Sequence, residues 1–194
     1  MDDGGQSALG WTAVHAFEAE HGVVLPEPYR MCVAEVSDGP WQGPPEYGLV
    51  GPAGLPVDRG DGAAGRRGGG AAGRRGGGAA GRRGGGADRA LGEPFALTAA
   101  WLWEEDEGPN EDPDSVIDAV SDHGSVVLGT DGRAMNWHLV VTGPHRGHIG
   151  HVTDVGALPF GAEFGHTTSA PGFADWVAHW AAGKEWFDAE SSPW

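Results

Sequence analysis

Residues 125–153 read SVVLGTDGRAMNWHLVVTGPHRGHIGHVT, and this stretch decides the fold. The odd positions of 135–141 are all apolar, and alternation with a period of two is typical of a half-buried strand. Asp131-Gly132 and residues 143–147 have the composition of turns. Strands are expected over residues 125–129, 135–142 and 148–153. The stretch therefore predicts an antiparallel meander.

Two helices are expected on the N-terminal side of this meander. Ser7 can cap a helix over residues 8–21, which Gly22 would end. Pro28 suits the first turn of a second helix. Apolar residues then recur at helical spacing on one stripe of that helix, namely Tyr29, Cys32, Val33 and Val36.

A further helix is expected over residues 170–182, with Ser169 as its cap and Gly183 as its end. Its apolar stripe consists of Phe173, Trp176, Val177 and Trp180. Between the outer helices we also expect a short strand at 47–50, a strand or short helix at 95–103, and an acidic loop from Glu104 to Asp114. The predicted class is α+β, an antiparallel sheet packed with N-terminal and C-terminal helices.

A low-complexity repeat interrupts the chain. Residues 63–86 are three copies of AAGRRGGG, and half of each copy is glycine, so the segment cannot bury enough apolar surface to offset its backbone entropy. We expect one domain over residues 1–194, with a flexible loop insertion at 51–92. A neutral expansion inside a surface loop is the simpler interpretation. A basic tether that contacts RNA or folds back on the acidic body is the alternative.

The chain is strongly acidic, with 12 Lys+Arg against 28 Asp+Glu and a net charge of −16. The repeat holds six of the 12 basic residues and no acidic one, so the other 170 residues carry 6 basic and 28 acidic side chains, a net of −22. Such acidity argues against binding to nucleic acid or anionic membranes, because both are polyanions.

Cys32 is the only cysteine, which excludes an intramolecular disulfide. No run of about 18 apolar residues is present to span a membrane. The start of the chain lacks a basic region followed by an apolar one, so we expect a cytoplasmic protein.

Four histidines lie within 14 residues and suggest metal chemistry, namely His138, His145, His148 and His151. On a strand, however, His148 and His151 would point to opposite faces, and no H-E-x-x-H motif supports them. Nucleophile-elbow and phosphate-loop motifs are also missing. The motifs therefore indicate no catalytic, cofactor or metal residues. A metal-dependent hydrolase is the weakest alternative.

Tryptophans and carboxylates supply the predicted binding site. Trp137, Trp176 and Trp180 fall on predicted core faces, whereas Trp101 and Trp103 lie at an element end, where tryptophan can anchor an interface. The carboxylates that follow lack calcium-loop spacing but could pair with a basic partner surface. The predicted contact residues are Trp101, Trp103, Glu104, Glu105, Asp106 and Glu107.

Several segments resemble the SUKH superfamily, which includes the yeast Smi/Knr cell-wall regulators and many bacterial immunity proteins. FEAEHGVVLPEPY at 17–29, running on to SDGP at 37–40, is similar to the family's N-terminal pattern. LGTDG at 128–132 and WHLVVTGPHRG at 137–147 resemble its central hairpin and Gly-x-x-Arg-Gly turn. Residues 173–186 resemble its closing helix.

The resemblance implies a non-enzymatic binding protein. Bacterial members of the superfamily resemble antidotes that bind and neutralise a toxin. Many such toxins are nucleases with basic substrate-binding surfaces, to which an acidic body would be steered. The partner predicted here is accordingly a basic toxin domain. A regulatory interaction module in cell-wall or signalling pathways, as the yeast members suggest, is the alternative. The oligomeric state is left open.

Deletion of residues 63–86 tests the interpretation of the repeat. We expect the shortened chain to fold with an unchanged melting temperature, because a glycine-rich insertion contributes no core. Thermal unfolding of both chains measures this. A large drop in melting temperature would show that the repeat is structural.

Overall fold

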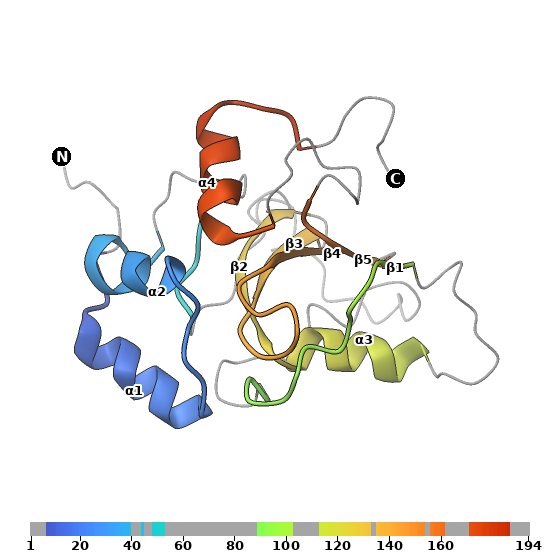
Figure 1. Ribbon diagram of the computed structural model, residues 1–194, viewed down its shortest axis with the longest axis horizontal. Coiled ribbons are helices and arrows are strands. Elements are labelled where there is room, and N and C mark those ends of the chain that lie inside the picture. The colour runs from blue at the N-terminus through green and yellow to red at the C-terminus, as the bar shows by residue number, and fades with distance from the viewer. Residues whose placement is uncertain are drawn as a thin grey trace, which may run out of the picture.

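The structure is a computed structural model, and Figure 1 shows helices on both sides of one sheet. The residues that it describes are 7–39, 44, 48–52, 89–102, 113–132, 135–153, 156–161 and 171–186. Their elements in chain order are α1 (Trp11–His21), α2 (Tyr29–Met31), the π-helical η1 (Cys32–Val36), β1 (Trp101–Leu102), α3 (Pro113–Asp122), β2 (Ser125–Gly132), β3 (Met135–Val140), β4 (Ile149–Val152), β5 (Gly156–Pro159) and α4 (Phe173–Ala181). The predicted insertion at 51–92 lies outside the described residues except for 51–52 and 89–92.

The five strands form one antiparallel sheet in the order β1-β5-β4-β3-β2. Strands β2 to β5 follow one another as a meander, and β1 pairs with β5 at the edge. The predicted α+β class with an antiparallel sheet is confirmed.

The predicted turn at Asp131-Gly132 is wrong, because both residues continue β2 and Gly132 pairs with Met135. The Thr130 hydroxyl stabilises this irregular extension by accepting from the Gly132 amide at 3.0 Å and donating to the Met135 carbonyl at 2.8 Å.

Both faces of the sheet are buried at β3. Trp137 and Leu139 enter the main core, which contains residues of α1, α2 and α4. His138 and Val140 point to the opposite face and are buried as well. Figure 1 shows α4 over one face and α3 beneath the other. The prediction of a half-buried strand is therefore wrong, because α3 and the segment before β1 cover the face expected to meet water.

Helix α1 ends at Gly22, as predicted, with the glycine at a φ of 66°. Its start differs from the prediction, since Gly10 and not Ser7 precedes the first helical residue. The amides of Leu9 and Gly10 donate to the carbonyls of Val33 and Ala34. These residues therefore run alongside η1 and are unavailable to begin the helix.

The predicted second helix is present, but its last turn is π-helical. Tyr29 and Val33 are buried, as the apolar stripe predicts, whereas Val36 is 70% exposed. The Ser37 amide donates to the Cys32 carbonyl five residues earlier, which widens the turn. That widening rotates Val36 off the apolar face, and Ala34 is buried there.

Helix α4 buries Phe173 and Trp176, as predicted, and Gly183 follows its end with a φ of 65°. The predicted cap Ser169 lies outside the described residues, and Gly172 occupies the cap position. The prediction that Trp180 is a core residue is wrong. Beyond Gly183 the chain brings Trp186 onto His179, so that the histidine is buried in the last turn and Trp180 is exposed.

Helix α3 was not predicted, and its first two residues fall in the expected acidic loop. Pro113 suits a first helical position, and Val116 and Val120 lie one turn apart. Val120 packs with Val152 and Ala157 of the sheet in a small second core. The spacing of these two valines indicates a helix, but the acidic composition of the preceding residues favoured a loop.

The two weaker strand predictions are largely wrong. Residues 48–50 form no strand, since Gly48 has a φ of 85° and the contact with β2 is a single bond from the Val50 amide to the Leu128 carbonyl. Of the described residues 95–102, only Trp101 and Leu102 are in a strand. The rest form an irregular segment whose Phe95 and Leu97 pack on the second core.

An internal ion pair fixes α1 to α2. The buried Glu18 carboxylate accepts two bonds from Arg30, at 2.7 and 2.8 Å, and one from the Leu25 amide at 2.9 Å. The hydrogen bond from Arg30 lowers the pKa of Glu18 below its ordinary value. The stabilisation is therefore present at neutral pH and is lost as the pH falls through that lowered pKa.

Glu18→Ala tests this link. We expect the free energy of unfolding to fall by about 2 kcal/mol, because charged hydrogen bonds to a buried backbone amide and a guanidinium are removed together. Urea denaturation measures the change. Glu20→Ala, an exposed carboxylate on the same helix, is the control and should change stability by less than about 0.5 kcal/mol. Equal effects would contradict the assignment.

Candidate binding surface

The structure describes one of the six predicted contact residues. Trp101 lies half-buried in β1, the outermost strand, where it pairs with Ala157 of β5. The other five lie outside the described residues, namely Trp103, Glu104, Glu105, Asp106 and Glu107. The beginning of the predicted cluster is therefore at an edge of the sheet.

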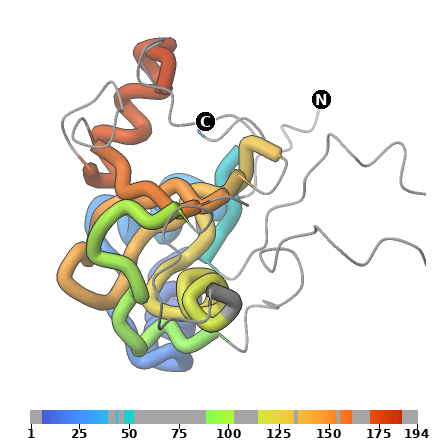
Figure 2. Tube along the Cα trace, turned by 90° about the vertical axis from the view of Figure 1, so that its right-hand side faces the viewer, coloured from blue at the N-terminus to red at the C-terminus, as the bar shows by residue number. Residues whose placement is uncertain are grey.

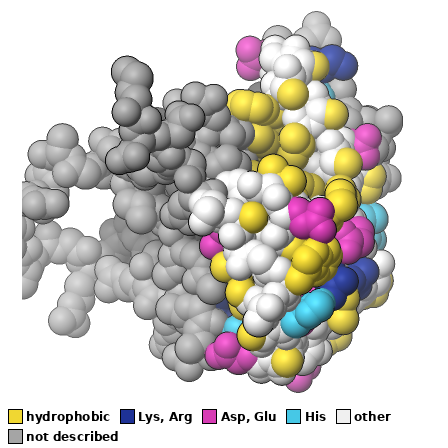
Figure 3. Space-filling view, turned by 90° about the vertical axis from the view of Figure 1, so that its left-hand side faces the viewer, with side chains coloured by type: hydrophobic (Ala, Val, Ile, Leu, Met, Phe, Trp, Pro, Cys, Tyr) yellow, Lys and Arg dark blue, Asp and Glu magenta, His cyan; other side chains and the backbone are white. Residues whose placement is uncertain are grey.

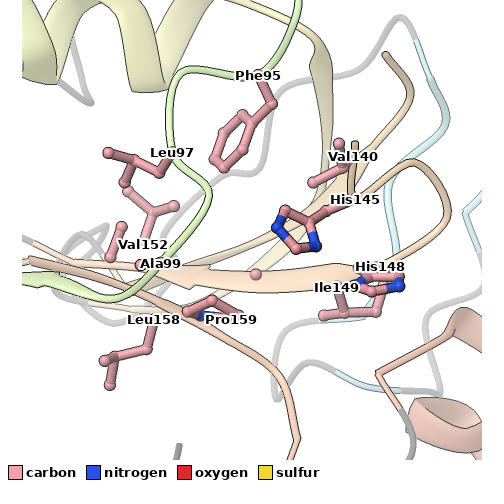
Figure 4. Close-up of a pocket in the computed structure, with 12 residues that line it drawn as sticks. Phe95, Leu97, Ala99, Val140, His145, His148, Ile149, Val152, Leu158 and Pro159 are labelled. Atoms are coloured by element: carbon pink, nitrogen blue, oxygen red, sulfur yellow. The ribbon is translucent and has the colours of Figure 1, made fainter. Parts of the chain in front are cut away.

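An apolar hollow lies between the segment that leads into β1 and the strands β4 and β5 (Figure 4). Phe95 and Leu97 line it on one side, and Val152 and Ala157 line it from the sheet. Its volume is about 30 Å³, whereas pockets that enclose small molecules have roughly 300 Å³ or more. The hollow therefore suits the end of one apolar side chain.

Hydrogen bonds hold the segment that walls this hollow. The Phe95 amide donates to the Thr142 carbonyl at 2.9 Å, and the Thr142 hydroxyl donates to the Leu91 carbonyl at 2.7 Å. Gly124, with a φ of 54°, allows a close approach, since a Cβ there would overlap the backbone of Glu93 and Phe95. The wall is thus fixed to the end of β3.

The structure separates the four clustered histidines. His145 and His148 close one end of the hollow, with ring centroids 5.2 Å apart. His138 lies inside the protein, where its Nδ1 is 3.0 Å from the Ser125 hydroxyl. His151 lies on the opposite sheet face, stacked on Trp137 at 4.4 Å. Among the described residues, no three His, Cys, Asp or Glu side chains are grouped to hold a metal ion.

Burial is the main cause of the shifted pKa of His138. Loss of solvation, with smaller contributions from the charges of Arg89 and His151, lowers the pKa of His138 from 6.5 to about 3. The imidazole is therefore neutral in the folded protein at neutral pH.

Helix α3 adds an acidic face that the sequence reasoning missed. Its aspartates Asp118 and Asp122 are four residues apart, a spacing that places them on one side of the helix. Asp118 is exposed, and the charge of Asp122 interacts with the half-buried Arg89. If residues 113–122 are recognised as a helix, the spacing of these aspartates predicts the acidic face.

The tryptophans divide between core and surface. Trp137 and Trp176 are fully buried, as predicted, and Trp137 donates from Nε1 to Asp131 at 2.7 Å. Trp186 packs on both of them. Trp11 and Trp180 are the two exposed ones among the described residues.

Comparison with known proteins adds no relative, because no protein-family model, no curated protein and no solved structure matches the chain. Among the described residues, no helix combines the length and the apolar character that crossing a membrane requires.

His138→Asn tests the buried histidine. The unfolded chain takes up a proton at this site near pH 6.5 and the folded chain only near pH 3, so the free energy of unfolding should fall as the pH drops. Between pH 7 and pH 5 we expect the parent protein to lose about 1–2 kcal/mol more than the variant does. Urea denaturation at both pH values measures this. His15→Asn, at an exposed position, is the control, and parallel pH profiles for parent and His138→Asn would contradict the assignment.

Proposed function

We propose that this protein is a non-enzymatic binding protein of the SUKH immunity type, which neutralises a cognate bacterial toxin by direct contact in the cytoplasm. The observation that carries the proposal is the concentration of negative charge, a net of −22 outside the arginine-containing repeat. Toxins that act on nucleic acid present basic surfaces, because their substrate is a polyanion. An acidic protein would find such a surface rapidly and cover it.

The described basic side chains leave this charge largely uncompensated. The structure describes four of them, and three bond within the chain: Arg30 to Glu18, Arg89 to the Ser121 carbonyl, and Arg146 to the Val24 carbonyl. The fourth is Lys184, which is exposed. Exposed carboxylates are therefore available to an external basic partner.

Trp101 and the acidic helix α3 are both linked to Ala157 of β5. Trp101 pairs with Ala157, and Ala157 packs with Val120 of α3 in the second core. An aromatic anchor beside a charged rim is the usual anatomy of a protein interface. The apolar hollow, which Ala157 also lines, would receive a side chain of the partner.

The order of elements is compatible with the SUKH resemblance. Two N-terminal helices precede the antiparallel meander, and α4 follows it. The segments on which the resemblance rests lie in α1, α2, the β2–β3 hairpin and α4. The fold and the charge together favour binding to a toxin.

Single substitutions in this surface test the proposal. The probes are the candidate toxin domains encoded in neighbouring genes, each co-expressed with the protein and titrated against it in calorimetry. We expect the parent protein to restore growth, and Trp101→Ala and Asp118→Lys each to weaken binding by tenfold or more.

Asp175→Lys is the matched control for Asp118→Lys. It reverses one exposed carboxylate on α4, changes the net charge equally, and should weaken binding less than threefold. Absence of binding and of rescue for every neighbouring toxin would contradict the proposed function and favour the regulatory module. Equal effects of the two charge reversals would contradict the placement of the surface.

A further inference from the structure

The N-terminal helical region exposes an unusual amount of apolar surface. Of the five large apolar side chains exposed among the described residues, four lie between residues 11 and 36: Trp11, Val24, Met31 and Val36. Figure 3 shows this side of the molecule, on which apolar side chains alternate with carboxylates, basic groups and histidines. Exposed apolar groups that gather on one face mark an interaction site more often than scattered ones do.

Trp11 is exposed yet held in place. Its Nε1 donates to the Glu35 carboxylate at 2.8 Å, and the Arg30 guanidinium lies 5.2 Å from the ring centroid. Arg30 is itself fixed by its two bonds to the buried Glu18. The indole is 36% exposed, so it is presented to solvent in one orientation.

This fixation distinguishes Trp11 from the other exposed tryptophan. Trp180 is 41% exposed, and its indole has neither a hydrogen bond nor a ring contact with another described residue. An immobilised aromatic ring loses little side-chain entropy when a partner covers it. Trp11 therefore has the properties of a preorganised anchor.

Two carboxylates frame the apolar groups. Glu35 accepts from Trp11, and Glu27 accepts from the Met31 amide at 3.2 Å and lies 3.8 Å from Arg30. A carboxylate has about four acceptor positions, so both can accept further bonds from outside. Met31 itself is 47% exposed.

We infer that the α1–α2 patch, formed by Trp11, Glu27, Met31 and Glu35, is a docking surface for a protein that presents an apolar side chain flanked by arginine or lysine. The complementary charge argues for this occupant, because both carboxylates can accept bidentate bonds from guanidinium groups. A second copy of the chain would bring acidic rims together, which costs binding free energy. The inference rests on the proposed function, and it adds a contact surface separate from Trp101.

The experiment uses the full chain and the same neighbouring toxin domain in calorimetric titrations. Trp11→Ala and Met31→Ala should each raise the Kd by tenfold or more, since interface anchors of this kind dominate binding. Trp180→Ala, at an equally exposed tryptophan, should change the Kd less than twofold. Thermal unfolding confirms that each variant folds.

Glu35→Gln tests how much the charge of Glu35 contributes to binding, separately from packing. The amide oxygen keeps an acceptor for the Trp11 indole, whereas the charge is removed. Binding should weaken at low salt, and the difference from the parent protein should shrink at high salt.

The outcomes distinguish failure of the α1–α2 patch from failure of the proposed function. If the parent protein binds and both Trp11→Ala and Met31→Ala behave like Trp180→Ala, the inference is wrong and the proposed function stands. If the parent protein binds no toxin, both fail. A concentration-dependent dimer that Trp11→Ala abolishes would identify a second copy as the occupant and overturn the inference.

Discussion

Burial of both faces of the central sheet is the constraint on which the rest of the structure depends. Trp137 and Leu139 are buried beneath the helices on one face, and His138 and Val140 are buried on the other. Trp137 also contacts His151, Phe160, Trp176 and Trp186, so that it joins β3 to β4, α4 and the segment after α4. With the middle of the sheet covered, the described residues that remain open to another macromolecule lie on the outer helix surfaces, at the hollow and at the sheet edge.

The two proposed binding surfaces lie on different sides of the molecule. Figure 1 places α1 and α2 at the left and β1 at the right. Trp101 and α3 are tied together through the small second core, whereas Trp11 is tied to the Glu18–Arg30 ion pair. A compact partner that covers one surface leaves the other open. The stoichiometry of the complex therefore distinguishes a partner that wraps around the chain from two partner molecules.

The sequence predicted the parts of the fold that local physics controls. Alternating apolar residues identified β3, and glycines with left-handed geometry ended α1 and α4 where expected. Contacts distant in sequence caused the errors. Trp186 buries His179 and leaves Trp180 exposed, and the π-helical turn exposes Val36.

The candidate site was harder to predict than the fold. Charge and aromatic content pointed to Trp101, which the structure places at the sheet edge. The aspartate face of α3 was missed because an acidic segment with prolines is typical of a loop. The importance of Trp11 follows from its bond to Glu35, 24 residues away in sequence, and no local pattern indicates that bond.

In the proposed function, a negatively charged protein recognises a basic partner. Stopped-flow fluorescence can measure the association rate of this chain with a candidate toxin domain over a range of salt concentrations. We expect an association rate that is high at low salt and falls steeply as the salt concentration increases, because screening weakens long-range attraction. A rate independent of salt would contradict it.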